Sequence, residues 1–432
     1  MKQAPTAPDV TRPLPPFDRP APAQDAPRIT PLKALLAAAA LAVAAGCAAS
    51  SGVSLAPHSG GGGRISNNIA RALPAVSPTP VPAENQSCDD GDAKDASCGV
   101  QKNPKLPPSK TPVGGLTPAQ LRSAYNLTPT ASGAVPNGPL IAIVDAFEDK
   151  HAEDDLATYR SQFGLPACTS KNGCFTKVVL TGPPPPPPPP GGPAAAGSAA
   201  TTWADEIALD LAMASAACPT CRLTLVESAG QDLDSLANAV NVAAGYNPAA
   251  ISNSWGVLEG GGNAPNIDPG AQAAFNHPGI AITASAGDLG QVEFPASSPY
   301  VTSVGGTTLT QDGTTARGWT ETSWANTGAG CSIMFAVPAW QNGSACTTGR
   351  AVPDVSVIAD YNPGIAVYSS AEKGWVVLGG TSAGAPFVAG LYAAANDYGA
   401  ATVGAPSLYA NASQLNVLGG ATLGSPNGLA GF

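Results

Sequence analysis

The strongest chemical signal in the sequence is a turn of small residues around Ser382, in the run GGTSAGAP at residues 379–386. We expect an apolar strand before the turn and an Ala-rich helix after it, an arrangement that presents the Ser382 hydroxyl at a helix N-terminus. Free N–H groups and the helix dipole there favour the negative charge that develops when a serine attacks a carbonyl group. A serine that only caps its helix gives the same pattern. Ser382 is therefore a candidate nucleophile that needs a base nearby.

Two acids in the run WADEIALD, Glu206 and Asp210, are the candidates for that base. Their spacing of four residues places them on one face of a helix, close enough to share a proton. Two adjacent carboxylates repel each other when both are ionised, so one pKa rises and the pair can accept and then return a proton. A solvated acidic face is the alternative, but the isoleucine and leucines between and after the acids make this helix largely apolar.

Asp288, the last residue of ASAGD at 284–288, is a third polar candidate because we expect it at the end of a strand. A protonated carboxyl group can donate a hydrogen bond to an oxyanion, whereas an ionised one cannot. Asp288 would therefore act only on the acid side of neutrality, unless burial raises its pKa. A plain structural turn is the alternative.

The histidines do not lie in settings that suggest a catalytic base. His58 falls in a Pro/Gly/Ser-rich region, His151 in a charged loop and His277 before ProGly in a turn. A hydrolase that uses His151 or His277 near neutral pH remains a rival interpretation.

Short apolar runs that alternate with Ala-rich helical stretches predict the elements that position these residues. Continuous apolar strands between helices are typical of a parallel sheet in an α/β fold, with active residues at the carboxyl ends of the strands. Thr117 and Pro118 predict the start of a short helix. The expected strands are 140–144, 223–226, 250–255, 279–285 and 375–378, and the expected helices lie around 203–217, 232–244 and 270–276.

The composition divides the chain into three parts. We interpret residues 1–46 as a signal peptide and 47–113 as a Pro/Gly/Ser-rich flexible stalk or short pro-segment, followed by a folded domain at 114–432. Cys47 is a candidate for lipidation, and cleavage at a nearby Ala-x-Ala site is the alternative. The proline run at 183–190 is expected to be a surface loop.

Charge and cysteine content narrow the function further. A net charge of −10, with no Lys/Arg cluster, argues against a nucleic-acid partner. Apart from Cys47, the cysteines form close pairs along the sequence, which suggests local disulfides in an oxidising compartment. Cys218-Pro-Thr-Cys221 could instead be a redox or zinc CxxC, but no second CxxC or pair of histidines lies nearby in the sequence. The expected pairs are Cys88/Cys98, Cys168/Cys174, Cys218/Cys221 and Cys331/Cys346.

The candidate motifs together resemble the sedolisin family of serine-carboxyl peptidases. GTSAGAP at Ser382 resembles the serine motif that this family shares with subtilisins, and Glu206 with Asp210 resembles the sedolisin Glu-x-x-x-Asp helix. Asp288 stands where a subtilisin has the asparagine of AlaGlyAsn. SNSWG at 252–256 resembles the strand that walls the substrate cleft. The resemblance covers residues 114–432 and implies a subtilisin-like three-layer fold with a mostly parallel central sheet.

The resemblance also implies a role for each residue. Ser382 would be the nucleophile, Glu206 its base and Asp210 the partner that orients Glu206, while Asp288 would donate to the oxyanion. Four further residues are expected beside the carboxylates or in the substrate cleft: Asp145, Ser254, Trp255 and Gly256.

The sequence therefore predicts an exported serine-type endopeptidase that cleaves polypeptides at acidic pH. We expect a monomer without a cofactor, located outside the cell, in the periplasm or on a membrane through a lipid on Cys47. A catalytically inactive surface-binding module on the same fold is the alternative. The segment 47–113 is short and poor in apolar residues for the folded pro-domain that these peptidases commonly carry.

Calcium binding is the expected departure from the family. Sedolisins usually bind calcium near the C-terminus through Asp-Ile or Asp-Val and a later Gly-rich loop with another Asp, but here Asn416-Val417 stands at that place and the loop is missing. Calcium sites usually include several carboxylate oxygens. We predict no tight calcium site, and equilibrium dialysis that finds one tightly bound calcium per chain would contradict this.

Overall fold

The apolar runs form the central sheet of the computed structural model, which has eight strands. All its strand pairs are parallel except the pair at one edge. The middle strand is buried at every residue, so side chains on both faces of the sheet are covered. From edge to edge the strands are β11 (Trp319–Ser323), β10 (Thr302–Gln311), β8 (Ala281–Ser285), β6 (Ala250–Asn253), β3 (Leu140–Ala146), β5 (Arg222–Ser228) and β4 (Phe175–Val179), and β14 (Val355–Ile358) also pairs with β10.

The structure describes residues 95–127, 137–181, 195–259, 267, 269–341, 346–395, 403–415 and 418, all within the unit Ala72–Phe432. Cys47, Cys88, His58, the proline run and the region of the expected calcium site lie outside them. Among the described residues, no helix has both the length and the apolar character needed to cross a membrane.

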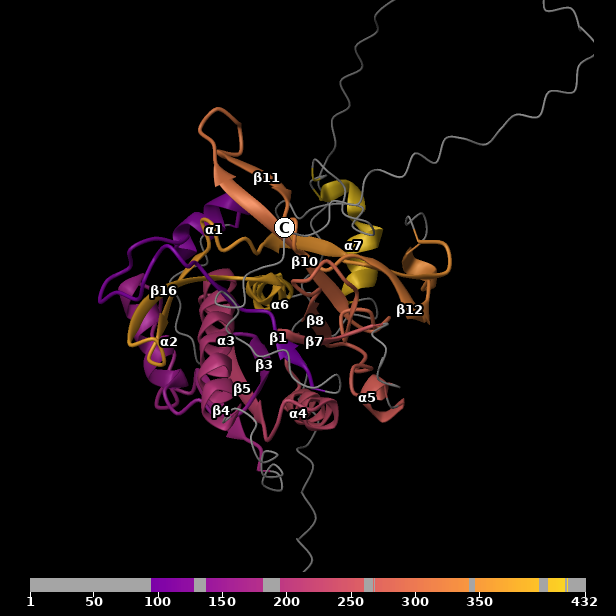
Figure 1. The fold of residues 1–432 in the computed structure, drawn as a ribbon, viewed down its shortest axis with the longest axis horizontal. Helices are drawn as coiled ribbons and strands as arrows, with labels where there is room; N and C mark the ends of the chain where they lie inside the picture. The colour runs from indigo at the N-terminus through magenta and orange to yellow at the C-terminus, as the bar shows by residue number, and fades with distance from the viewer. Residues whose placement is uncertain are drawn as a thin grey trace, which may run out of the picture. The chain divides into compact units, whose positions relative to one another are not determined.

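Helices cover the sheet and carry the site (Figure 1). α3 (Ala195–Ala217) packs against α6 (Gly384–Ala394) and α2 (Ala152–Gln162), and α6 lies on β6 and β8. α4 (Leu233–Gly245) packs against β3 and β5. Between residues 203 and 217, α3 is buried almost all round, because apolar side chains occupy every face of the helix. Any acid on this part of α3 is therefore held away from water.

The expected strand at 250–255 is broken at Ser254 into β6 and β7 (Trp255–Leu258). Three small sheets lie beside the central one, with the orders β1-β7-β9, β12-β13 and β15-β16-β2. The remaining elements are β1 (Ser97–Cys98), β2 (Gln101–Lys102), α1 (Pro118–Ala124), α5 (Pro269–Ala273), β9 (Glu293–Phe294), β12 (Gly330–Ala336), η3 (Ala339–Gln341), β13 (Gly349–Val352), β15 (Ile365–Ser369), β16 (Gly374–Gly379), η4 (Thr381–Ala383), α7 (Ala405–Ala410) and η5 (Ala412–Gln414).

Residues 95–113 differ from the sequence-based expectation of a flexible stalk up to residue 113. β1 pairs antiparallel with β7, and β2 pairs antiparallel with β16. Ala96 and Val100 are buried in the core. Composition pointed to a stalk because the segment is rich in polar residues and proline, but pairing through backbone N–H and C=O groups needs no apolar side chain. The folded part therefore includes residues 95–113.

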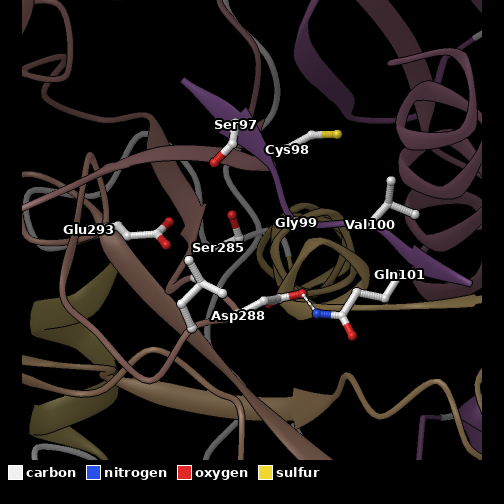
Figure 2. Close-up of a pocket in the computed structure, with 10 residues that line it drawn as sticks. Ser97, Cys98, Gly99, Val100, Gln101, Ser285, Asp288 and Glu293 are labelled. Atoms are coloured by element: carbon white, nitrogen blue, oxygen red, sulfur yellow. Dashed lines mark hydrogen bonds between the residues drawn. The ribbon is translucent and has the colours of Figure 1, made fainter. Parts of the chain in front are cut away.

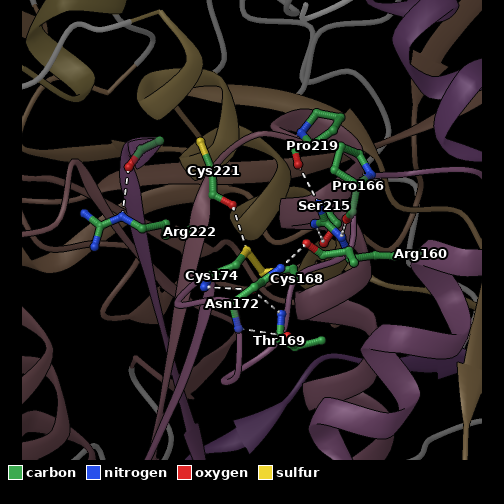
Figure 3. The surroundings of a disulfide bond; sticks show 12 residues. Arg160, Pro166, Cys168, Thr169, Asn172, Cys174, Ser215, Pro219, Cys221 and Arg222 are labelled. Carbon is green, nitrogen blue, oxygen red and sulfur yellow. Dashed lines mark hydrogen bonds between the residues drawn. A yellow bond between two sulfur atoms is a disulfide. The ribbon is translucent and has the colours of Figure 1, made fainter. Parts of the chain in front are cut away.

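Two neighbouring disulfides stabilise the loops around the start of β4 and β5. Figure 3 shows the first of them, Cys168–Cys174, with Cys221 nearby. Cys168–Cys174 and Cys218–Cys221 have Cα–Cα distances of 4.8 and 5.3 Å. The buried guanidinium group of Arg160 donates to two backbone carbonyl groups and to the Ser215 hydroxyl nearby. Cys331–Cys346 is also formed. Three of the four predicted pairs are therefore confirmed, and the partner expected for Cys98 lies outside the described residues.

Candidate active site

The turn that carries Ser382 follows β16 directly and leads through η4 into α6. Gly380 adopts φ +100°, a conformation that favours glycine, and a β-carbon there would collide with the backbone carbonyl of Gly99. Ser382 is completely buried. The small residues predicted from the sequence thus allow a tight turn and the close approach of another chain segment.

Ser382 meets the predicted base on α3. Its hydroxyl donates to Oε2 of Glu206 at 3.0 Å. Asp210 lies one helical turn further on, and the charge of Glu206 raises the pKa of Asp210. Ser254, in the break between β6 and β7, donates to Oδ1 of Asp210 at 2.8 Å and also lies 3.3 Å from the backbone oxygen of Ser382. Hydrogen bonds therefore join the Ser382 hydroxyl to Glu206 and the Ser254 hydroxyl to Asp210.

Asp145 adds a third carboxyl group to this buried cluster. Burial raises the pKa of Glu206, Asp210 and Asp145 well above its usual range, and the negative charges of neighbouring carboxylates raise each one further. In the described part of the chain no group donates to Oε1 of Glu206, Oδ2 of Asp210 or either oxygen of Asp145. Such atoms are satisfied when neighbouring carboxyl groups hold protons between them. The cluster is thus built to retain protons.

Asp288 lies beyond the carboxyl end of β8, on the other side of the Ser382 turn. Its Oδ1 accepts from the backbone N–H and the hydroxyl of Thr381, at 2.8 and 2.7 Å. Its Oδ2 accepts from the side-chain amide of Gln101 at 3.0 Å. Burial raises the pKa of Asp288 to about 7, although these hydrogen bonds oppose the shift. Asp288 can therefore hold a proton over the whole acidic range.

Trp255 and Gly256, which the sequence places in a cleft wall, lie on β7. The Trp255 indole N–H donates to the backbone oxygen of Val144 at 3.0 Å, so it ties β7 to β3. β7 pairs with Ser97 and Cys98 of β1. Figure 2 shows the pocket beside this pair, which residues 97–101 line together with residues of the β8–β9 region.

Sequence reasoning missed the residues of the 97–101 segment and the role of Thr381. Gly99 N–H lies 3.2 Å from the Ser382 hydroxyl oxygen, and Val100 N–H donates to Oε2 of Glu206 at 3.0 Å. These contacts join positions more than 100 residues apart and use mainly backbone atoms, so no side-chain pattern reveals them. Thr381 could have been noticed, because it stands inside the serine motif.

The described histidines lie elsewhere. His151 precedes α2, and His277 is partly exposed and hydrogen-bonded to Asn241. Within the described ranges, the group that accepts from the Ser382 hydroxyl is the carboxyl group of Glu206, not a histidine. In the same ranges, no cluster of three or more His, Cys, Asp or Glu residues is placed to hold a metal ion.

Comparisons with known proteins agree on one group of relatives. No family model matches the chain. Kumamolisin from Bacillus sp. (strain MN-32) is 33% identical over 225 residues, which are 44% of this chain and 39% of kumamolisin. Xanthomonalisin from Xanthomonas sp. (strain T-22) is 39% identical over 121 residues, 24% of this chain and 14% of that protein. Sedolisin from Pseudomonas sp. (strain 101) is 31% identical over 189 residues, 37% of this chain and 30% of sedolisin.

The chain therefore spans about two fifths or less of the length of these curated relatives. Among solved structures, Pseudomonas sedolisin, a serine-carboxyl proteinase complexed with two molecules of pseudo-iodotyrostatin, matches with a TM-score of 0.57 and 23% identity. The match covers 74% of this chain and 92% of that one, and it shows the same fold.

Buried acids with raised pKa values predict an unusual dependence of stability on pH. Between their ordinary pKa values near 4 and the value of about 7 for Asp288, Asp205 and Glu227, the folded state binds more protons than the unfolded state. We therefore expect the free energy of unfolding to fall as pH rises from 4.5 to 7. The measurement is the denaturant midpoint of a Ser382→Ala variant, which removes self-digestion.

Asp288→Asn in the same background is the matched control, and it should flatten the slope because the amide does not titrate. Each pKa unit corresponds to about 1.4 kcal/mol per group. A midpoint that rises between pH 4.5 and 7 would contradict the assignment of these acids as proton-holding groups.

Proposed function

Because this chain belongs to the sedolisin family, we propose that it is a serine-type endopeptidase that hydrolyses polypeptides at acidic pH. The observation that carries the proposal is the 3.0 Å hydrogen bond from the Ser382 hydroxyl to Glu206. It places a proton acceptor directly on a buried serine at a helix start, which is the arrangement that nucleophilic catalysis needs. This intact bond also argues against an inactive binding module.

In the proposed mechanism, Ser382 attacks the carbonyl carbon of the scissile bond while Glu206 accepts its proton. Asp210 holds Glu206 in place and spreads the charge, and Ser254 supports Asp210 through its 2.8 Å hydrogen bond. Glu206 then passes the proton to the leaving amine, and a water molecule hydrolyses the resulting ester. The negative charge of Asp145 raises the pKa of Glu206. A proton therefore stays within the cluster, close to the reacting atoms.

Asp288 supplies the second part of the mechanism as the donor to the oxyanion, together with the backbone N–H of Ser382. Both hydrogen bonds from Thr381 fall on Oδ1, and Oδ2 accepts from the Gln101 amide, so a proton on Oδ2 would replace the Gln101 contact when Asp288 becomes a donor. An ionised Asp288 would repel the oxyanion. Activity should therefore decline as pH rises through about 7, the pKa of Asp288.

Substrate binding and location follow from the same features. β7 is suited to pair with the backbone of an extended peptide, which gives affinity with little sequence selection. Local disulfides such as Cys331–Cys346 favour an oxidising compartment and thus export. We propose a monomer that is secreted, periplasmic or attached to a membrane by a lipid on Cys47.

Loss of the serine or its base should abolish acid-side cleavage. We expect Ser382→Ala and Glu206→Gln each to reduce kcat/KM on denatured protein by about a thousandfold or more at pH 4, because each removes a group of the same reacting unit. The measurement is a pH profile from 3 to 8 for the parent and both variants. A neutral optimum that Glu206→Gln leaves unchanged would reject the mechanism and favour a histidine-dependent hydrolase.

Asp288→Asn tests the oxyanion assignment separately. An amide donates a hydrogen bond at every pH, so the decline near pH 7 should move to higher pH, with a loss of about tenfold or less at pH 4. Thr381→Ser, which keeps the hydroxyl donor, is the control and should keep the parent's profile. If the Asp288→Asn profile falls at the same pH as the parent's, another group sets the alkaline limit.

A further inference from the structure

Glu227 is a buried acid that the proposed mechanism does not use. It lies on β5, where the parallel register pairs it with Asp145 of β3. Paired residues of neighbouring strands lie about 5 Å apart and direct their side chains to the same face of the sheet. Both residues are completely buried. A second acid therefore lies directly beside the carboxyl cluster of the candidate active site.

Neither Glu227 nor Asp145 has the hydrogen-bond partners that a buried ion needs. Oε1 of Glu227 accepts from the backbone N–H of Asp149 at 2.8 Å. The ammonium group of Lys177 lies 3.6 Å from Oε2, which is too far for a hydrogen bond. In the part of the chain that the structure describes, no group donates to Oε2 of Glu227 or to either oxygen of Asp145. One proton held between the two carboxyl groups would satisfy both of them.

The elements packed around Glu227 carry several charged groups. These are Lys177 on β4, Asp145 on β3, Glu148 and Asp149 in the loop after β3, Asp234 on α4 and Arg222 at the start of β5 itself. Burial raises the pKa of Glu227 to about 7, although the Asp149 N–H and the charge of Lys177 oppose the shift. The charge of Glu227 in turn raises the pKa of Asp145. Both acids are thus disposed to hold a proton at acidic pH.

Glu227 stands between the buried cluster and the edge of the sheet. β3, β5 and β4 lie side by side in that order, and β4 is the outermost strand (Figure 1). Lys177 of β4 is partly exposed and donates to the backbone oxygen of Asp149 at 2.8 Å. This contact holds the loop that supplies the N–H donor to Glu227. The side chain of Glu227 is therefore fixed in place from the edge of the sheet.

We propose that Glu227 is a positioning residue for the reaction, which shares a proton with Asp145 and thereby keeps one negative charge beside Glu206. This inference rests on the proposed peptidase function. It extends the proton-holding cluster by one acid, on the side away from Ser382.

Glu227 would act on Glu206 through Asp145. A hydrogen bond to the ionised form of an acid favours that form, so a proton on Oε2 of Glu227 allows Asp145 to carry a charge in a dry interior. The negative charge of Asp145 raises the pKa of Glu206. Glu206 then accepts the Ser382 proton more readily. When the shared proton moves to Asp145, it leaves Glu227 ionised, so the pair keeps the same total charge.

Two substitutions of Glu227 separate this role from simple packing. Glu227→Met fills similar space without a donor, so Asp145 keeps its own proton and no longer raises the pKa of Glu206. We expect kcat to fall by about tenfold at pH 5 with little change in KM, and the acid-side limb of the kcat profile to move down by about one pH unit. Glu227→Gln keeps an N–H donor at every pH, and we expect it to retain the activity and acid-side limb of the parent.

The measurement is the pH profile of kcat and KM on denatured protein from pH 3 to 7. Glu148→Met is the matched control, because Glu148 also contacts Lys177 but is exposed, and it should keep the parent's profile. A Glu227→Met enzyme whose acid-side limb stays where the parent's lies would overturn the proposal. So would a Glu227→Gln enzyme that loses as much kcat as Glu227→Met.

Infrared spectroscopy of the Ser382→Ala protein tests the shared proton without turnover. In this background at pH 5, Glu227→Gln should remove a C=O stretching band of a protonated carboxyl group. Asp145→Asn should shift the same band, because it changes the partner of that proton. If Glu227→Gln removes no such band, or if Asp145→Asn leaves the band in place, the two acids do not share a proton and the proposal is wrong.

The two measurements separate failure of this inference from failure of the proposed function. If the parent digests denatured protein at pH 4 and Glu227→Met keeps the parent's profile, the role of Glu227 fails and the peptidase proposal stands. If the parent digests nothing, the proposed function fails and the role of Glu227 in the reaction fails with it. The infrared bands then still decide whether Glu227 and Asp145 share a proton.

Discussion

The whole site depends on the cost of placing several carboxyl groups together in a dry interior. Glu206, Asp210 and Asp145 are fully buried, and three adjacent negative charges without water or a cation would be far less stable than a cluster that keeps protons. The cluster contains more carboxylate oxygens than the donors of the described residues can satisfy. Protons must supply the missing hydrogen bonds. The same constraint that threatens stability at neutral pH therefore favours the proton transfer that we propose between Ser382 and Glu206.

Only a few residues of the fold are needed to hold these carboxyl groups together in the interior. α3 is buried nearly all round, which places Glu206 and Asp210 in the interior without a special loop. The break between β6 and β7 releases Ser254 from the sheet, so its hydroxyl can bond to Asp210 and its neighbour Trp255 can bond to the end of β3. Gly380 leaves room for the carbonyl of Gly99. The helix α3, the end of β6 and the turn before α6 each contribute one part of the site. A shift of any one of them would break the hydrogen bond of Ser382 to Glu206 or that of Ser254 to Asp210.

Sequence patterns predicted the parts of the molecule that local physics determines. Apolar periodicity placed β3, β5, β8 and α4, and the sedolisin motifs predicted a mostly parallel sheet that the structure confirms. The pattern at 250–255 did not reveal the break at Ser254, because nothing in the neighbouring residues requires it. Composition alone was misleading for residues 95–113, whose order comes from backbone pairing with β7 and β16. Contacts through main-chain atoms between distant segments leave little trace in residue types.

The contact of Gln101 with Asp288 bears on the role that we propose for Asp288 as a donor to an oxyanion. An asparagine would donate at every pH and could not respond to its surroundings. Asp288 changes from acceptor to donor when it gains a proton, and its pKa of about 7 places that change between a neutral and an acidic compartment. Asp205, which holds Lys102 on the other side of Gln101, has a pKa of about 7 as well. The two buried acids that contact this short segment, Asp288 and Asp205, thus change charge over the same range of pH.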